Sequence, residues 1–526
     1  MSFTDRDFLT ADGIHMKNRD GETVMLRGTN FGGWLLREGW MDGAGMCLAE
    51  LEPERVTRRE NYIAFDFGKA VRWNRFIIGD HAVGSYSVYS SEDGDIWTEV
   101  GTADFTEFDG PVRDDTRPTA YDIKGLNDTR FYFWQGQMHM QEMKTRYAKI
   151  EFEQVPVKVI PARYGDISDY ESRRVLEERF GRDEADEMIA AYQKAFITEW
   201  DLDYVKGLGF NLVRIPIYWQ EIMDKNKKIK ADAFEDLDWL MEKCREKEIY
   251  VMPDFHGSPG GHVMGSITGG ELDSNSLWYR EEYQEMDREI WRAIANRYLG
   301  DPVIAAYDLL NEPMPNLSGT EDIGEGFAGL RQFQDPVAVN TNVPEFMNQQ
   351  VREFYDSLYK TVKEIDTEHV ICFQFFQDFN MLGDPGDYEW ENFMIQTHTY
   401  GIPTWRDHDG QLIFMRKVIE KHEEAIAKWQ VPFFAGEFNF WGFYDIWAEW
   451  LDTLNKMEIG WANWSYKISD TNVQDSWSLL YDYNGQFANF YTDSKEEILK
   501  KYKNFTSDNY KINKELEEVM RKYAGV

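Results

Sequence analysis

The strongest constraint on the fold is a pair of apolar, strand-like segments that each lead into a glutamate. Glu312 follows the run Asp308-Leu-Leu-Asn, and Glu437 follows Phe433-Phe-Ala-Gly. Each run is typical of a buried parallel strand. In a (β/α)8 barrel the active site lies at the carboxyl ends of the strands, so both side chains are catalytic candidates. Two carboxyl groups that face one cleft meet the need of glycosidic hydrolysis, because one protonates the leaving oxygen and the other meets the oxocarbenium-like carbon.

Strands and helices alternate over most of the chain. A helix is expected over 175–196, another begins at Thr198-Glu-Trp-Asp201 with Glu199 and Asp201 as first-turn charges, and further helices cover 234–246 and 283–298. Alternation of this kind predicts a parallel sheet, and eight repeats predict closure into a TIM (β/α)8 barrel. The eight strands are expected at residues 23–30, 210–217, 249–255, 303–310, 369–375, 393–397, 432–436 and 459–464.

A segment of different texture interrupts this alternation after the first strand. It contains short β runs separated by turn signals such as Glu92-Asp-Gly-Asp95. This spacing predicts an all-β jelly roll or sandwich inserted between barrel strands one and two. The expected domains are therefore a catalytic barrel of residues 1–50 and 162–526 and a β-sandwich insertion of residues 51–161. The β runs lie at 62–67, 73–78, 85–90, 96–100, 130–134 and 147–152.

The charge balance narrows the class of partner. Lys and Arg number 57 against 94 Asp and Glu, which gives a net charge of −37. A field of this sign repels phosphate backbones and anionic membrane surfaces. We therefore expect neither nucleic acid nor a membrane as a partner, and the oligomeric state stays open.

The cysteines and the N-terminus bear on the compartment. Cys47, Cys244 and Cys372 are far apart and odd in number, so we expect buried free thiols, which fit a reducing compartment. The residues after Met1 lack the features of a signal peptide, and no run approaches membrane-spanning length. The expected location is cytoplasmic.

Polar and aromatic residues follow the other predicted strands and would face the same mouth as the two glutamates. Trp34 and Trp477 are weaker candidates for stacking on a sugar ring. The nine histidines include no His-x-x-x-His pair or Asp/His cluster of ligand spacing, so neither a metal site nor a cofactor is expected. The strand-end residues are Arg214, His256, Asn311, His398, Tyr400 and Trp464.

Together these strand-end motifs resemble glycoside hydrolase family 5, over the whole predicted barrel from Arg27 to about Lys467. The segments Leu26 to Trp34, Asp254 to Gly260 and Trp464 to Lys467 are most similar to the exo-β-1,3-glucanase and β-glucosidase side of that family, although a large insertion after strand one departs from its pattern. The motifs are Leu212-Val-Arg-Ile-Pro216, Asp254-Phe-His-Gly-Ser-Pro-Gly260, Asn311-Glu-Pro313, His398-Thr-Tyr400, Gly436-Glu-Phe438 and Trp461-Ala-Asn-Trp464.

The resemblance implies a retaining β-glycoside hydrolase that works through a covalent glycosyl-enzyme. Glu312 would be the proton donor and needs a raised pKa, whereas Glu437 would be the nucleophile and must stay ionised beside Arg214. The resemblance also assigns supporting roles: Asn311 to the sugar 2-hydroxyl, Tyr400 to Glu437, Trp464 to the floor of the cleavage subsite, and His256 and His398 to positioning.

The inserted segment has a resemblance of its own. Residues 84–100 and 146–152 are similar to the discoidin, or factor 5/8 type C, fold found in many carbohydrate-binding modules. Because the insertion leaves after strand one and returns before strand two, we expect it to shape substrate access. Whether it binds carbohydrate or calcium stays open.

Several functional alternatives remain at the level of sequence. A non-catalytic carbohydrate-binding protein would be expected to have lost one of the four central residues Glu312, Glu437, Asn311 and Arg214, and all four are present. An endo-acting β-glucanase, or a β-mannosidase or mannanase, would share the same site. The substrate is expected to be an oligosaccharide or glycoside, with the sugar, the linkage and exo or endo action undecided.

Overall fold

The chain forms two compact units. The first comprises Met1–Gly43, Ile167–Phe487 and Lys495–Val526, and the second comprises Ala44–Asp166 and Ala488–Ser494. Along the chain, most of the second unit lies between the first and second barrel strands. The computed structural model describes residues 3–525 except 43–46, 80–83, 106–130, 135–136, 154–157, 166–167, 264–274, 316–344, 376–378 and 470–477.

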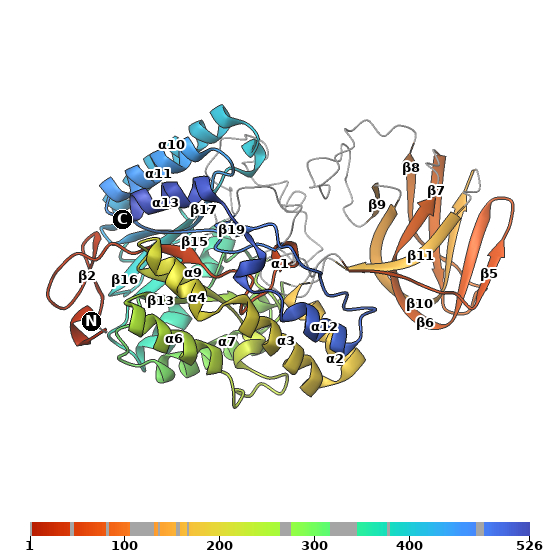
Figure 1. Cartoon of the computed structure of the whole chain (residues 1–526), viewed down its shortest axis with the longest axis horizontal. Helices are drawn as coiled ribbons and strands as arrows, with labels where there is room; N and C mark the ends of the chain where they lie inside the picture. Colours follow the sequence, from red (N-terminus) through yellow and green to blue (C-terminus); the bar gives the residue numbers. More distant parts are fainter. Residues whose placement is uncertain are drawn as a thin grey trace. The chain divides into compact units, whose positions relative to one another are not determined.

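Eight parallel strands close into a barrel in the first unit, which confirms the predicted TIM-barrel fold (Figure 1). The fourth strand is shorter than the predicted 303–310. Only Tyr307 and Asp308 form the strand, and before them the segment makes a single isolated bridge, from Ile304 to Val251. The strands, in order around the barrel, are β12 (Leu212–Tyr218), β13 (Tyr250–Gly257), β14 (Tyr307–Asp308), β15 (Ile371–Phe375), β16 (Phe393–Tyr400), β17 (Phe433–Asn439), β18 (Gly460–Asn463) and β3 (Arg27–Asn30).

Helices surround this barrel (Figure 1). The prediction of a single helix over 175–196 is wrong. The structure has two helices there, α2 and α3, and Gly181 separates them with a positive φ of 89°. The predicted start of α4 is confirmed, since Thr198 is its N-cap and forms a capping box with Asp201. The helices are α1 (Gly39–Asp42), α2 (Asp169–Phe180), α3 (Arg182–Phe196), α4 (Glu199–Gly207), α5 (Trp219–Ile222), α6 (Glu235–Lys247), α7 (Glu281–Arg297), α9 (Glu345–Lys363), α10 (His408–Trp429), α11 (Tyr444–Lys456), α12 (Lys495–Tyr502) and α13 (Lys514–Ala524).

The amino end of the barrel is closed by apolar side chains. An N-terminal hairpin of β1 (Thr10–Asp12) and β2 (His15–Lys17) supplies Met16, which packs with Leu9 against Met252, Phe434 and other interior residues. This plug leaves the carboxyl ends of the strands as the place for polar groups. A short antiparallel pair, β19 (Leu480–Tyr481) with β20 (Lys511–Ile512), completes the unit.

The second unit is an antiparallel sheet (Figure 1). Its strands run in the order β4-β11-β6-β10-β7-β8, with β5 beside β6 and β9 beside β10. The predicted runs at 62–67 and 73–78 belong to one long strand, β6. The apolar core of the unit includes Phe65, Trp73, Phe76, Val88 and Ile150. The strands are β4 (Cys47–Glu50), β5 (Arg55–Arg58), β6 (Tyr62–Gly79), β7 (Gly84–Ser91), β8 (Thr98–Phe105), β9 (Phe131–Trp134), β10 (Gln137–Phe152) and β11 (Lys158–Gly165).

Two further expectations concern thiols and membranes. Cys244 and Cys372 are buried free cysteines, as predicted. Within the described part of the chain, no helix combines the length and the apolar character needed to span a bilayer.

Candidate active site

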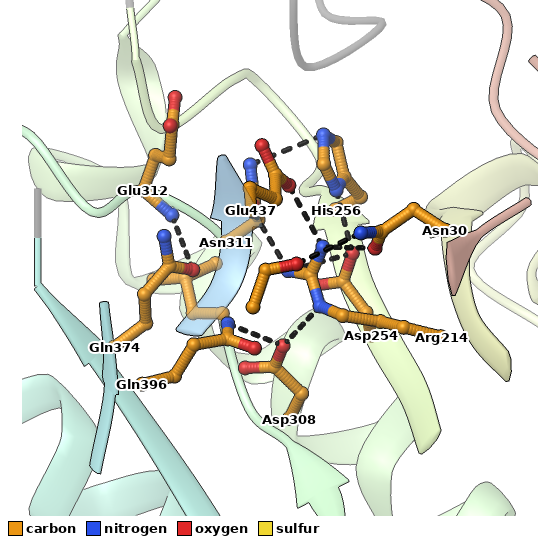
Figure 2. Close-up of polar contacts among 12 residues, drawn as sticks. Asn30, Arg214, Asp254, His256, Asp308, Asn311, Glu312, Gln374, Gln396 and Glu437 are labelled. Atoms are coloured by element: carbon orange, nitrogen blue, oxygen red, sulfur yellow. Dashed lines mark hydrogen bonds and ion pairs between the residues drawn. The ribbon is translucent and has the colours of Figure 1, made fainter. Parts of the chain in front are cut away.

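A single buried arginine organises the carboxyl end of the barrel. Arg214 projects from β12, and its Nε donates to Oδ2 of Asp308 at 2.8 Å. Its Nη1 donates to Oε1 of Glu437 at 2.7 Å, and its Nη2 lies 3.0 Å from Oδ2 of Asp254 (Figure 2). Burial lowers the pKa of Arg214, but the three carboxylates outweigh this effect and raise the pKa above its ordinary value. Arg214 therefore stays a cation and ties strands β13, β14 and β17 together.

Two carboxamides fix the orientation of this guanidinium. Oδ1 of Asn30 accepts from Nη1 of Arg214 at 3.0 Å, and Oδ1 of Asn311 accepts from Nη2 at 2.9 Å. Asn30 also donates from Nδ2 to the carbonyl oxygens of Gly436 and Asn463, at 2.8 and 3.0 Å. Since these partners come from separate strands, the arginine cannot turn without breaking bonds across the barrel.

Glu437 has an environment suited to a charged carboxylate. Besides its bond to Arg214, it accepts from the hydroxyl of Tyr400 at Oε2, at 2.9 Å. The register of β16 against β17 pairs His398 with Glu437, so the two side chains are neighbours. A cation and a phenol that both donate to the carboxylate favour its ionised form.

Glu312 lies in a different environment. It follows β14 with a left-handed φ of 42°, a conformation that costs about 1–3 kcal/mol for a residue other than glycine and is found at functional sites. Its backbone N–H donates to Oε1 of Gln374 at 2.9 Å, and its Oε1 lies 2.7 Å from Nδ1 of His398. Figure 2 shows its carboxyl group pointing away from Arg214.

These environments separate the two glutamates in acidity. Burial raises the pKa of Glu312 well above its ordinary value, and the charge of Glu437 raises it further. Burial also raises the pKa of Glu437 above its ordinary value, although Arg214 and the hydrogen bond from Tyr400 limit that rise. The first proton to bind the pair therefore resides on Glu312.

A second histidine, His256, lies beside two partners of the arginine, Asp254 and Asn311. Nδ1 of His256 lies 2.6 Å from Oδ2 of Asp254, and its Nε2 lies 3.1 Å from Nδ2 of Asn311. Because Oδ1 of Asn311 faces Arg214, Nδ2 must donate to His256, which places the histidine proton on Nδ1. Burial lowers the pKa of His256 to about 3, so the ring is neutral. The ring stacks on Trp464 with centroids 5.4 Å apart.

Glu312, His398 and Glu437 also have the donor types of a metal site, with one ligand atom of each lying within 4.8 Å of the others. The hydrogen bonds around His398 argue against a metal ion there. Nε2 of His398 accepts from Gln374 at 2.9 Å, so Nδ1 carries the ring proton and has no lone pair to offer. The donor set of these described residues therefore does not fit a divalent cation.

The barrel brings most of the predicted site residues together. Arg214, His256, Asn311, Glu312, His398, Tyr400, Glu437 and Trp464 all lie at this end. Trp34 is not among them, because it is 1% exposed and its Nε1 donates to the carbonyl oxygen of Gln193 at 3.0 Å. Trp477 lies outside the described residues.

Five polar residues of the site were absent from the sequence-based set. Each is a buried polar side chain within or at the end of an apolar strand, and that mismatch was the available signal, since a buried polar group must find a partner. They are Asn30, Asp254, Asp308, Gln374 and Gln396.

The chain is similar in part to several known proteins. The beta-xylosidase of Phanerodontia chrysosporium is 22% identical over 327 residues, which cover 57% of this chain and 62% of that protein. The glucan 1,3-beta-glucosidase of Candida oleophila is 26% identical over 342 residues, 62% of this chain and 69% of that protein. The chain thus spans less than two thirds of the xylosidase. Among solved structures, the endoglucanase Cel5A of Thermotoga maritima aligns over 62% of this chain and 90% of its own, with 19% identity and a TM-score of 0.40.

The family itself is established by a match over the barrel. The sequence profile of the cellulase family, glycosyl hydrolase family 5, matches residues 182–470, which is more than half of the chain and contains Arg214, both glutamates and both site histidines. The protein belongs to glycosyl hydrolase family 5.

Proposed function

We propose that this protein is a retaining β-glycosidase of the β-glucosidase and exo-β-glucanase type, with Glu437 as nucleophile and Glu312 as acid and base. The observation that carries the proposal is the asymmetry of the two carboxyl groups. Glu437 accepts from Arg214 at 2.7 Å, whereas Glu312 accepts from the neutral His398 and points away from the cation. One group is thereby kept ionised and the other protonated, which are the two states that glycosidic cleavage requires.

The chemistry follows in two displacements. In the first, a carboxylate oxygen of Glu437 bonds to the anomeric carbon, the glycosidic C–O bond breaks, and the leaving oxygen takes the proton of Glu312. In the second, Glu312 removes a proton from water, the water oxygen bonds to the anomeric carbon, and the ester to Glu437 breaks. Two inversions give net retention of configuration.

The spacing of the two groups supports this route. A carboxylate oxygen of Glu312 and one of Glu437 lie within 4.8 Å of each other. Inverting glycosidases hold their carboxyl groups about 6.5–9.5 Å apart to admit a water molecule, whereas retaining ones hold them at about 5–5.5 Å. The short separation favours direct attack by Glu437.

The neighbouring side chains have roles that agree with this proposal. Tyr400 donates to Glu437 and would release that bond as the ester forms. Asn311, held by Arg214 and His256, would present its amide to the sugar 2-hydroxyl, where hydrogen bonds strengthen in the transition state. Trp464, backed by the ring of His256, would form the floor under the sugar.

The preference for β-glucosides draws on the relatives. One is named as a glucan 1,3-beta-glucosidase and another as an endoglucanase, and both act on glucose polymers by name. Another is named as a beta-xylosidase, so the sugar at the cleavage subsite needs a direct test.

That test is a panel of aryl β-glycosides, comprising the glucoside, xyloside, mannoside and cellobioside, assayed with the wild type and with Glu437→Gln. We expect the glucoside or cellobioside to be hydrolysed fastest, and turnover to fall by at least about 10³-fold in the variant, equivalent to about 4 kcal/mol. Equal turnover by the variant and the wild type would refute the assignment of Glu437, and faster cleavage of the mannoside would refute the glucosidase assignment.

We also propose that the second unit is a discoidin-like module that contacts carbohydrate. Its sheet carries a hollow of about 370 Å³ on the face opposite its apolar core, since Tyr62 and Asp66 alternate along β6 with the buried Ile63 and Phe65. Aromatic faces with charged groups of both signs suit a neutral polyhydroxylated ligand. The lining includes Arg55, Tyr62, Asp66, Trp97, Tyr147 and Lys149.

The proposed carbohydrate site of the second unit is tested in the full-length Glu437→Gln variant, which we expect to bind substrate without hydrolysing it. Trp97→Ala, which removes a ring from the hollow, should weaken binding of a soluble β-glucan about tenfold in calorimetry. Ile96→Ala is the matched control, because Ile96 is 75% exposed and does not line the hollow. Equal affinities in the two variants would contradict a carbohydrate site here.

A further inference from the structure

We propose that Gln374 is a positioning residue that selects the tautomer of His398 and thereby directs the proton of Glu312 toward the substrate. This inference rests on the proposed acid role of Glu312. Gln374 lies near the end of β15, is fully buried, and is not among the residues that the family resemblance marked.

The orientation of the Gln374 amide is determined by the main chain. The backbone N–H of Glu312 points to this side chain at 2.9 Å (Figure 2). An N–H can bond only to an acceptor, so the group facing Glu312 is the amide oxygen. The amide nitrogen must then face the other way, where it lies 2.9 Å from Nε2 of His398.

This orientation decides which nitrogen of His398 carries the proton. Nε2 accepts a hydrogen bond from the amide and is therefore unprotonated. Burial and the positive charge of Arg214 lower the pKa of His398 well below its ordinary value, so the ring holds one proton, on Nδ1. That proton faces both carboxyl groups, since Nδ1 lies 2.7 Å from Oε1 of Glu312 and 3.3 Å from Oε2 of Glu437.

The tautomer in turn decides where the acid holds its proton. Oε1 of Glu312 accepts from Nδ1–H, so the carboxyl proton belongs on Oε2, where it is available to the leaving oxygen. In the opposite tautomer Nδ1 would offer a lone pair to Glu312, and the carboxyl proton would bond to the ring instead. Gln374 therefore keeps the proton of the acid on the oxygen that can deliver it.

Gln374 is itself anchored where the two strands end. The hydroxyl of Tyr355 lies 2.9 Å from the carbonyl oxygen of Leu310 and 2.8 Å from that of Gln374, which ties the end of β14 to β15. The same amide oxygen supplies a partner for the buried N–H of Glu312 in its left-handed conformation. If Gln374 had only a structural role, its bond to the N–H of Glu312 would be enough and its bond to His398 would not matter. The variants are therefore chosen to separate these two bonds.

Gln374→Glu separates the two roles. When the introduced carboxyl is ionised, it keeps an oxygen for the N–H of Glu312 but replaces the donor to His398 with an acceptor, so it demands a proton on Nε2. Gln374→Met removes both contacts. The matched control is Gln396→Glu, since Gln396 pairs with Gln374 in the register of β15 and β16, is equally buried, and bonds to Asp308 instead of His398.

The test uses the full chain labelled with ¹⁵N-histidine, with the resonances of His398 assigned by comparison with His398→Phe. We expect the wild type and Gln396→Glu to show a protonated Nδ1 and a bare Nε2, and Gln374→Glu to show a protonated Nε2 once a pH titration has ionised the introduced carboxyl. A protonated Nε2 in the wild type, or an unchanged tautomer in Gln374→Glu, would overturn the inference. This readout needs no turnover, so it does not depend on the proposed function.

The effect of Gln374 on proton delivery by Glu312, the catalytic half of the inference, is tested with aryl β-glucosides that carry good or poor leaving groups. Gln374→Glu and Gln374→Met should lose about 10- to 100-fold in kcat/KM on the poor leaving group and much less on the good one, because only the former needs the proton. Equal losses on both substrates would show a structural role alone. Failure of the wild type to cleave either substrate would overturn the proposed function and this half of the inference, while the NMR result would still stand.

Discussion

The guanidinium of Arg214 donates to Glu437 at 2.7 Å while it also contacts Asp254 and Asp308, so that one buried cation faces three carboxylates. Burial makes two of these carboxyl groups weaker acids than usual. Burial raises the pKa of Asp254 to about 7 and that of Asp308 to about 6, although Arg214 opposes both shifts. The arginine is thus the main stabilising charge for Glu437 and for the barrel interior beneath it.

Replacement of this arginine should be costly for stability. Arg214→Met leaves several buried carboxylates without their cation, and removal of one partner from a buried pair typically costs about 3–5 kcal/mol in the free energy of unfolding. Urea denaturation followed by fluorescence measures this change. The control is Arg416→Met, which removes a solvent-exposed pair with Glu449 and should cost less than about 1 kcal/mol. Similar losses in the two variants would contradict the role of Arg214 as the central charge.

The proposed acid role of Glu312 predicts a dependence on the leaving group. Glu312→Ala should lower kcat/KM by about 10²–10⁴-fold on substrates with poor leaving groups, because general acid catalysis contributes about that much. Activated aryl glycosides should be affected much less in the first displacement, since their leaving groups need no proton. A plot of log kcat/KM against leaving-group pKa should therefore be steeper in the variant. Parallel plots for variant and wild type would remove Glu312 from this role.

The same assignment predicts the shape of the pH profile. Glu437 must be ionised, so kcat/KM falls as the pH drops through its pKa. Glu312 must be protonated, so kcat/KM falls again as the pH rises through a pKa that burial and the charge of Glu437 raise well above 4.5. The measurement is kcat/KM against pH, with Glu312→Ala on an activated substrate as the comparison. Persistence of the alkaline limb in Glu312→Ala would assign that limb to another group.

The junction of α2 and α3 offers a test of the backbone argument. Gly181 has a φ of 89° and a ψ of 164°, a region that only glycine adopts readily, and nothing lies within 4 Å of a Cβ placed there. Gly181→Ala should therefore destabilise the protein by about 1–3 kcal/mol through backbone strain alone. Gly207→Ala, at the end of α4 and equally open, is the control and should be neutral or stabilising. Equal effects would show that no strain arises at Gly181.

The outline of the barrel and the position of the two glutamates at its carboxyl end were predictable because both depend on local patterns. Apolar runs of strand length recur with helical segments between them, and each carboxylate follows such a run. The helix break at Gly181 was missed because a single glycine inside an otherwise helical pattern is often tolerated. The short β14 was missed because the apolar run 303–310 does not reveal which of its residues pair with the neighbouring strands.

The supporting network required the closed structure. Gln374 is the single polar residue of β15, whereas Gln396 is one of several polar residues of β16, and the sequence does not show that the first bonds to His398 and the second to Asp308. Their partners lie 24 and 88 residues away. Only the register of the barrel brings them together, so the choice of tautomer at His398 could not be predicted from motif spacing. The burial of Trp34 likewise depends on α3, which supplies the carbonyl oxygen of Gln193.

The most direct test of the account is the configuration of the first product. Hydrolysis of an aryl β-glucoside, followed by ¹H NMR within the first minutes before mutarotation, reports whether the anomeric centre is retained or inverted. Glu312 and Glu437 with carboxylate oxygens within 4.8 Å predict the β-anomer as the first product, formed through an ester at Glu437. Initial appearance of the α-anomer would contradict the two-displacement route and the assignment of Glu437 as nucleophile.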